Sequence, residues 1–241
     1  MGLDMSLFRA HNVAGLTSEQ YTAIDQYVHQ MLNDSRMLAD GTTTTGPSSL
    51  DLESGTGIVG ANALRDSIHV NGDPQSFTWF SIFEEIAYWR KANAVHAWFV
   101  NTVQDGVDEC QLSPSITSEH LTELRDRALL VLASRPEISR RPPKRVRRNS
   151  ELTINTLKAL VQDPRSPFGE RQAAAIALAK NTFPFPVVAE LLLPPQGGFF
   201  FGSTDIDSYY YEDLQDTVQQ INQVLESTDF TTQVVFYHAS W

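Results

Sequence analysis

The sequence predicts an α+β fold in which a layer of α-helices covers a small antiparallel or mixed sheet. Strand-like segments lie at both ends of the chain, in residues 1–9 and 231–241, and a third is predicted at 198–204. Amphipathic helical patterns fill much of the sequence between them. We expect the 241 residues to form one domain, since this length can bury a sizeable core without disulfides.

The first strand and the first helix are predicted from side-chain spacing. Residues 1–9 place Leu3, Met5 and Leu7 at alternate positions, which is typical of a half-buried strand. Thr17 and Gln20 form a capping-box pattern at the start of a helix. Residues 40–60 are rich in Gly, Ser and Thr and predict a long surface loop.

The remaining elements are predicted mainly as helices. Residues 80–103 form the most apolar long segment and predict a single buried helix. Another helix is expected to begin at Thr117 or Ser118. Further helices are predicted at 152–161, 170–180 and 207–226, while residues 187–193 fit a short helix or a strand.

Composition excludes several classes of protein. The formal net charge of −11 argues against a general nucleic-acid coat protein. No apolar run is long enough for a membrane span, and we expect no membrane contact. The single Cys110 excludes an intramolecular disulfide, and with no export signal we expect a cytoplasmic protein.

One basic segment contrasts with the acidic average. Residues 135–148 hold seven of the eighteen Lys and Arg residues. Pro142 and Pro143 exclude a regular helix there. The segment fits either a solvated loop beside the acidic body of the protein or a contact for phosphate groups.

The predicted helix around Trp89 provides a first candidate site. On a helix, Glu85, Trp89, Asn93 and His96 would share one face, with Arg90 on its flank. Polar groups on a buried helix need partners. They could pair internally, as Glu85 with His96 or Arg90, or they could face a wet cavity that binds a polar ligand.

A second candidate site lies in residues 198–214, GFFFGSTDIDSYYYEDL. Its Ser and Asp residues could simply cap the following helix, with Ser203, Thr204, Asp205 and Ser208 as candidates. Alternatively, Tyr210 or Tyr211 stacks on a base while the backbone at 202–204 binds a phosphate.

Known catalytic patterns are missing from the sequence. It contains no phosphate-binding glycine loop, no GxSxG and no pair of His residues at metal-ligand spacing. Cys110 follows Asp108 and Glu109, whose charges would raise its pKa rather than activate it. We therefore expect a binding protein without metal or cofactor rather than an enzyme.

The sequence resembles a family of small bacteriophage proteins without an assigned activity. The resemblance rests on MGLDM, EEIAYWRKANAVHAWFV, GFFFGSTDIDSYYYEDL and a C-terminal strand that closes on Ser-Trp. It implies a phage origin, so that the cytoplasm would be that of the bacterial host, and it supplies no catalytic residues. Family members join their first strand to the Trp-Arg-Lys segment more directly, which marks about 10–77 and 140–185 as insertions. The positions in the shared motifs are Trp89, Arg90, Lys91, Asn93, His96, Gly202, Ser203, Thr204 and Tyr211.

These observations predict a non-enzymatic binding protein for a small anionic ligand, with a nucleotide as the best fit. Sequestration of a host nucleotide immune signal would be its function, and a homo-oligomer with pockets at its interfaces is compatible with it. The predicted ligand-binding residues are Trp89, Arg90, Asn93, His96, Ser203, Thr204, Tyr210 and Tyr211.

Two alternatives stay open at this point. One is a metal-assisted nucleotide phosphohydrolase using Asp205, Asp207, Glu212 and His96. The other is a structural or protein-interaction module, such as an inhibitor of a host enzyme or a virion component.

Overall fold

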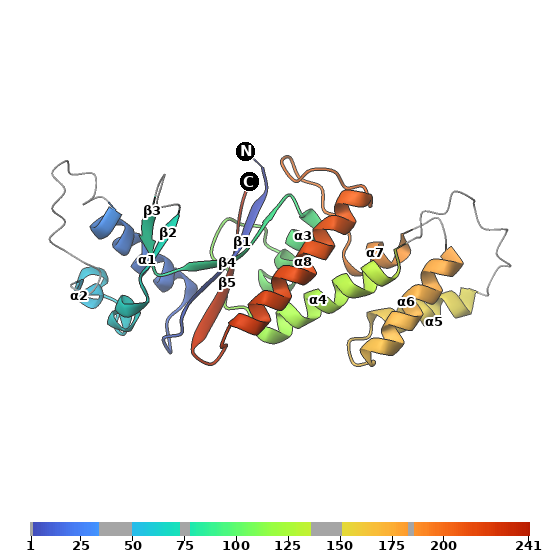
Figure 1. The fold of residues 1–241 in the computed structure, drawn as a ribbon, viewed down its shortest axis with the longest axis horizontal. Coiled ribbons are helices and arrows are strands. Elements are labelled where there is room, and N and C mark those ends of the chain that lie inside the picture. Colours follow the sequence, from blue (N-terminus) through green and yellow to red (C-terminus); the bar gives the residue numbers. More distant parts are fainter. Residues whose placement is uncertain (1, 34–49, 73–77, 136–150, 183–185) are drawn as a thin grey trace.

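The computed structural model describes residues 2–33, 50–72, 78–135, 151–182 and 186–241 (Figure 1). The fold is α+β, as predicted, with a small antiparallel sheet at its centre and helices packed around it. Of the predicted loop at 40–60, residues 40–49 lie outside the described residues, and residues 52–56 form a short helix instead of a loop. All of the basic segment except Arg135 also lies outside the described residues.

The central sheet joins the two ends of the chain. Strand β1, Asp4–His11, lies between β4, Glu84–Arg90, and β5, Gln233–Ser240, and both neighbours run antiparallel to it. In the register, Met5 lies opposite Trp89 on one side and Ala239 on the other. The strands predicted at both ends are therefore confirmed.

The prediction of one helix over 80–103 is wrong. Residues 84–90 form β4, and the helix α3 begins only at Asn93 and ends at Val103. Pairing with β1 decides this, because β4 inserts the alternate residues Ala87 and Trp89 into the same core as Met5. Glu85 and Trp89 consequently do not share a helical face with Asn93 and His96.

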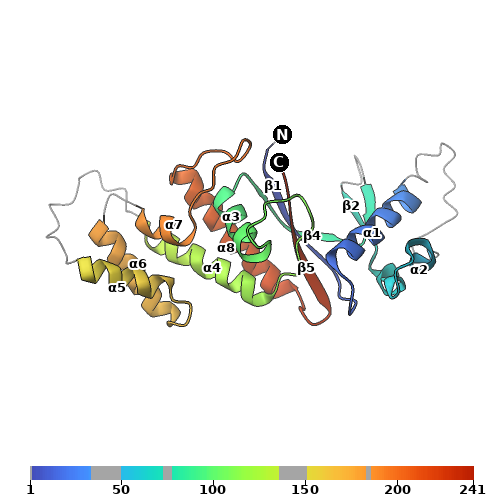
Figure 2. The same cartoon turned by 180° about the vertical axis from the view of Figure 1, so that it is seen from behind.

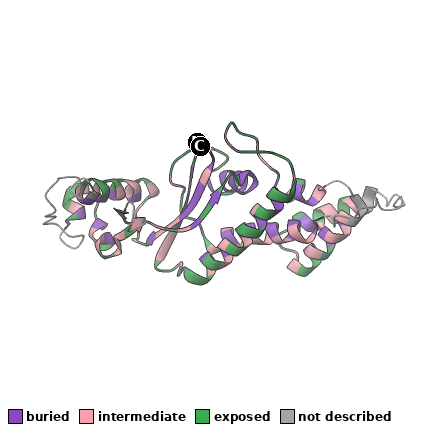
Figure 3. Cartoon of the chain, turned by 45° about the horizontal axis from the view of Figure 1, so that its top comes forward, coloured by how far each residue is buried: buried purple, intermediate pink, exposed green. Residues whose placement is uncertain are grey.

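A layer of helices covers one face of this sheet (Figure 1). Besides α3 it contains α4, Ser118–Ala133, which Thr117 caps, and α8, Ser208–Ser227. The sheet residues in this core are Met5, Leu7, Ala87, Trp89, Val235, Tyr237 and Ala239, and Leu3 joins them from just before β1. Buried residues concentrate in the central strands and α3, whereas α8 also presents an exposed face (Figure 3).

Three further helices extend this layer away from the sheet (Figure 2). They are α5, Glu151–Gln162, α6, Phe168–Thr182, and α7, Val187–Leu192. Helices α6 and α7 both pack against α4, and α5 packs against α6. The helices expected in these regions are confirmed, and 187–192 is a helix rather than a strand.

A second core lies on the other side of the sheet (Figures 1 and 2). Helix α1, Ser18–Val28, starts with the predicted Thr17 capping box and continues as a π-helical turn, His29–Asn33. This core also includes α2, Leu52–Thr56, a 3-10 helix, Ala61–Ser67, and the strand pair β2, His69–Gly72, and β3, Thr78–Ser81. Its apolar members from these elements and the sheet include Ala10, Tyr21, Ile24, Val28, Leu52, Leu64, Ile82 and Phe236.

Both edges of the central sheet are occupied by other parts of the chain. At the β4 edge the side-chain amide of Gln220 on α8 accepts a bond from the Tyr88 N–H and donates one to the Tyr88 carbonyl, each at 2.8 Å. At the β5 edge, Ser113 and Ile116 donate backbone bonds to Tyr237 and Val235. An unpaired edge would attract other strands, so these contacts limit the sheet to three strands.

The strand predicted at 198–204 is absent. This segment is a loop in which Gly202 has a φ of +89° and the ring of Phe199 is 94% exposed. In the described part of the chain, no helix combines the length and apolar character that a membrane span needs.

Candidate functional site

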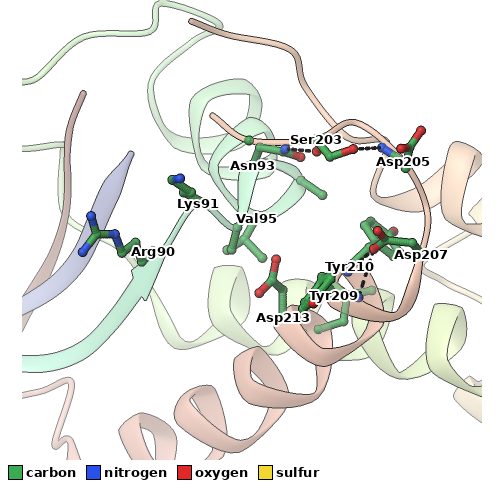
Figure 4. A pocket seen from close by; sticks show the side chains of 14 residues that line it. Arg90, Lys91, Asn93, Val95, Ser203, Asp205, Asp207, Tyr209, Tyr210 and Asp213 are labelled. Atoms are coloured by element: carbon green, nitrogen blue, oxygen red, sulfur yellow. Dashed lines mark hydrogen bonds between the residues drawn. The ribbon is translucent and has the colours of Figure 1, made fainter. Parts of the chain in front are cut away.

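The two sequence motifs meet at a cavity of about 370 Å³ (Figure 4). One wall comes from the end of β4 and the start of α3, and the other from the 202–207 loop and the first turns of α8. The lining residues are Arg90, Lys91, Ala92, Asn93, Ala94, Val95, Gly202, Ser203, Asp205, Asp207, Tyr209, Tyr210, Asp213 and Leu214.

A sharp turn at Lys91 produces the first wall. Lys91 has a φ of 61°, a left-handed conformation that is unfavourable for a residue with a side chain. The Asn93 N–H then bonds to the Lys91 carbonyl at 2.8 Å, which closes an inverse γ-turn around Ala92. The Lys91 N–H is itself bonded to the carbonyl of Leu3, the residue before β1, at 2.7 Å. The turn is thus fixed to the sheet and directs the chain into α3.

The N-terminus of α3 opens onto the cavity. No side chain caps this helix, and the first residues of its backbone line the cavity. Among the described residues, nothing accepts a hydrogen bond from the Ala94 N–H. The positive end of the helix dipole and a free N–H donor therefore face the same space as Lys91.

Asn93 holds the two walls together. Its side-chain amide donates to the carbonyl of Phe201 at 3.2 Å and to that of Ser203 at 2.8 Å. Between these residues, Gly202 uses its positive φ to pass close to the Lys91 side chain. Asn93 is therefore a structural clamp of the cavity, buried to 5% exposure.

The cationic side chains lie at one end of the cavity. Arg90 and Lys91 are exposed, and in Figure 4 the Arg90 guanidinium points towards β1 rather than across the cavity. Its Nε lies 3.8 Å from the Asp4 carboxylate, which offsets part of its charge. Lys91 has no ion pair among the described residues, and its side chain extends beside Gly2 at the rim of the cavity, so its charge is not offset.

The opposite wall is acidic. Asp207 caps α8 by accepting from the N–H groups of Tyr209 and Tyr210 at 2.9 and 3.1 Å. Asp207 was not among the four N-cap residues proposed from the sequence. Partial burial and the nearby acidic groups Asp216, Glu212 and Asp207 raise the pKa of Asp213 to about 6.

His96 is part of the core rather than of the cavity. It is fully buried, with Nδ1 2.7 Å from the Tyr237 hydroxyl and Nε2 3.0 Å from an Asp108 carboxylate oxygen. The second contact is poorly aligned for a hydrogen bond. Burial lowers the pKa of His96 although Asp108 opposes this. His96 is therefore paired inside the protein, as one of the two interpretations proposed, but its partners are Tyr237 and Asp108 rather than Glu85.

The other groups of the first motif are also held in the fold. Glu85 accepts a hydrogen bond from the Ser6 hydroxyl at 2.6 Å and does not contact His96 through any described bond. The Trp89 ring is buried at 2% exposure and packs 6.2 Å from the ring of Phe99. Neither side chain lines the cavity.

The tyrosines of the second motif have three different environments. Tyr210 lines the cavity, but its hydroxyl is bonded to the Leu193 carbonyl at 2.8 Å. Tyr211 is buried beneath the guanidinium of Arg135, 4.9 Å from its ring centre. Tyr209 lines the cavity and is 73% exposed, so it has the ring that a ligand could reach.

Of the eight residues predicted as ligand-binding, half line the cavity. These are Arg90, Asn93, Ser203 and Tyr210. Thr204 is exposed outside it, and the other three are buried elsewhere. The sequence analysis omitted Lys91, Tyr209 and Asp213 from the predicted site. The i, i+4 spacing of Tyr209 and Asp213 on the correctly predicted last helix could have identified that pair.

The structure gives no support to the metal-assisted alternative. Within the described ranges, no three His, Cys, Asp or Glu residues are grouped so that they could hold a metal ion. Asp205 and Asp207 line the cavity, but His96, on α3, points into the core and does not line it. Comparisons with protein-family models, with curated proteins and with solved structures returned no match to this chain.

Proposed function

We propose that the protein binds a small anionic ligand, a nucleotide, in the cavity between the two motifs, and that it does so without turnover. The observation that carries the proposal is the meeting of Lys91, the uncapped start of α3 and the exposed Tyr209 ring around one space of about 370 Å³. A nucleotide has complementary parts, namely a phosphate and a flat base.

The phosphate belongs at the β4–α3 end. Lys91 offers an unpaired ammonium group, and the Ala94 N–H offers a donor at the positive end of the helix dipole. Arg90 adds charge at the rim, although Asp4 already shares it. His96, which the sequence analysis placed among the ligand-binding residues, does not take part, because it is fully buried in the core.

The base belongs at the α8 end. The Tyr209 ring is free to stack on the base. From the sequence, this role was expected for Trp89 and for Tyr210 or Tyr211. The acidic wall would repel a highly charged ligand, because it contributes Asp205, Asp207 and Asp213 against two basic residues. Nucleotides with one or two negative charges, such as cyclic nucleotides, therefore suit the cavity better than triphosphates.

For a phage-type protein, such binding has a direct use. The two motifs that form the cavity are the same two that carry the resemblance to bacteriophage proteins. Sequestering a host nucleotide immune signal requires a pocket and no catalytic group, and this matches the residues around the cavity. We propose inhibition of antiviral defence as the outcome.

Isothermal titration calorimetry against cyclic mononucleotides, cyclic dinucleotides and ADP-ribose tests this function. We expect saturable binding by the wild type, weakened at least tenfold in Lys91→Gln. Lys158→Gln, on α5 and outside the cavity, is the matched control and should bind like the wild type. The proposal fails if no nucleotide binds, and chelator-sensitive hydrolysis of the ligand would instead support the phosphohydrolase.

One observation favours a protein partner as a second candidate. The ring of Phe199 is 94% exposed on the loop that precedes the cavity. An exposed aromatic of this kind is typical of a contact with another protein. If Phe199 serves that role, Phe199→Ala will abolish capture of a host protein and leave nucleotide affinity unchanged.

A further inference from the structure

Asp213 is a partly buried carboxylate of the cavity without a described partner, whereas Asp205, which also has none for its side chain, is exposed to solvent. No described residue donates a hydrogen bond to the side chain of Asp213 or forms an ion pair with it, while Asp207 is already engaged as the cap of α8. In Figure 4 its carboxylate extends from α8 towards Val95 across the cavity. An acceptor in this position is available to a ligand.

Tyr209 lies four residues before Asp213 on α8. Residues at this spacing are neighbours on one helical face, with Cβ atoms about 5–6 Å apart. Both line the cavity, and Tyr209 has the exposed ring. A base stacked on Tyr209 would therefore present one of its edges to the Asp213 carboxylate.

An ionised carboxylate only accepts hydrogen bonds, so it distinguishes the bases by their donors. Guanine offers two adjacent donors, N1–H and the N2 amino group, which match the two carboxylate oxygens. Adenine and cytosine each place a ring-nitrogen acceptor beside their amino group, which would face a carboxylate oxygen unfavourably. Uracil has a single N–H between two carbonyl groups.

We propose that Asp213 is a specificity-determining residue that selects a guanine base stacked on Tyr209, an inference that rests on the proposed nucleotide-binding function. The surrounding acids strengthen the argument. Partial burial, together with Asp216, Glu212 and Asp207, raises the pKa of Asp213 to about 6, so the group is ionised at pH 7.5 but lacks a compensating donor. Two guanine donors would supply that compensation.

The test compares 3′,5′-cyclic GMP, cyclic IMP and cyclic AMP by calorimetry at pH 7.5. The wild type should bind cyclic GMP about tenfold to a hundredfold more tightly than cyclic AMP, the discrimination expected of a bidentate contact. Cyclic IMP, which lacks the N2 amino group, should fall between them. Asp216→Asn, on the same helix but outside the cavity, should keep this order.

Asp213→Asn should gain affinity for a xanthine nucleotide, which would not happen if Asp213 had only a structural role. An Asn amide presents one acceptor and one donor, which fit N1–H and O2 of xanthine. This variant should therefore lose cyclic GMP by about tenfold or more and gain cyclic XMP by a similar factor.

The two proposals fail in different ways. If the wild type binds cyclic GMP and cyclic AMP equally, and Asp213→Asn changes neither preference, the guanine inference is overturned while nucleotide binding stands. If none of the nucleotides binds, the proposed function is itself overturned.

Discussion

Replacing Tyr237 by Phe should destabilise the protein more than its single missing oxygen suggests. The Tyr237 hydroxyl lies 2.7 Å from Nδ1 of His96, and both side chains are completely buried. Asp108 beside Nε2 favours a proton on that nitrogen, which leaves Nδ1 as the acceptor for the hydroxyl. The substitution would leave Nδ1 without a partner in the core.

The magnitude follows from that unpaired acceptor. A buried polar group that loses its only partner costs about 1–3 kcal/mol, and we take about 2 kcal/mol here because the hydroxyl leaves no large void. For a chain of this length, that loss lowers Tm by about 4–8 °C. The stacked pair that Tyr237 forms with Phe99, with ring centres 4.1 Å apart, is retained by Phe.

Thermal unfolding followed by circular dichroism measures the effect. Tyr88→Phe is the matched control, because the Tyr88 hydroxyl bonds to Asp4 at an exposed position and its loss should cost less than about 0.5 kcal/mol. Equal Tm values for Tyr237→Phe and the wild type would show that the buried contact contributes no net stability, and the reasoning would be refuted.

Three further predictions concern the clamp, the loop and the buried histidine. Asn93→Asp replaces two donors by an acceptor facing two carbonyls, so hydrogen–deuterium exchange in residues 198–206 should become faster. Gly198→Ala would place a Cβ 2.5 Å from the Phe201 ring and should lower Tm by several degrees, whereas Gly197→Ala, with 3.7 Å to its nearest neighbour, should not. In an NMR titration His96 should be protonated to a smaller extent at pH 6 than a free histidine, which is about three-quarters protonated there, because burial lowers the pKa of His96. Since the unfolded chain binds that proton more readily, the contribution of His96 to the free energy of unfolding should decrease as the pH falls below about 6.5.

The elements with local signals could be predicted from the sequence. The Thr17 capping box marked the start of α1, and the regular apolar spacing of the last helix fixed α8 nearly to the residue. The β-branched and aromatic run at the C-terminus identified β5. In each case the signal lies within the few residues that form the element, so no knowledge of tertiary contacts was needed.

The candidate site depended on contacts that a local pattern does not reveal. Residues 84–90 have a composition typical of a helix, but their antiparallel pairing with β1 makes them a strand. The left-handed turn at Lys91 follows from that pairing, since the chain must leave the sheet and begin α3 at once. The sequence therefore predicted that the two motifs form one site, but it assigned Trp89 and His96 to the ligand-binding cavity when they belong to the core.

The Gln220 side chain that completes the β4 edge has a consequence for assembly. A side-chain amide can be swung aside by rotation about its own bonds, whereas a backbone partner cannot be removed without unfolding. The edge of β4 is thus protected at Tyr88 by a side chain that can move. Gln220→Leu would remove this protection and leave the Tyr88 N–H and carbonyl without their hydrogen-bond partner. Dimers formed strand to strand by this variant alone would show that one amide keeps neighbouring molecules apart.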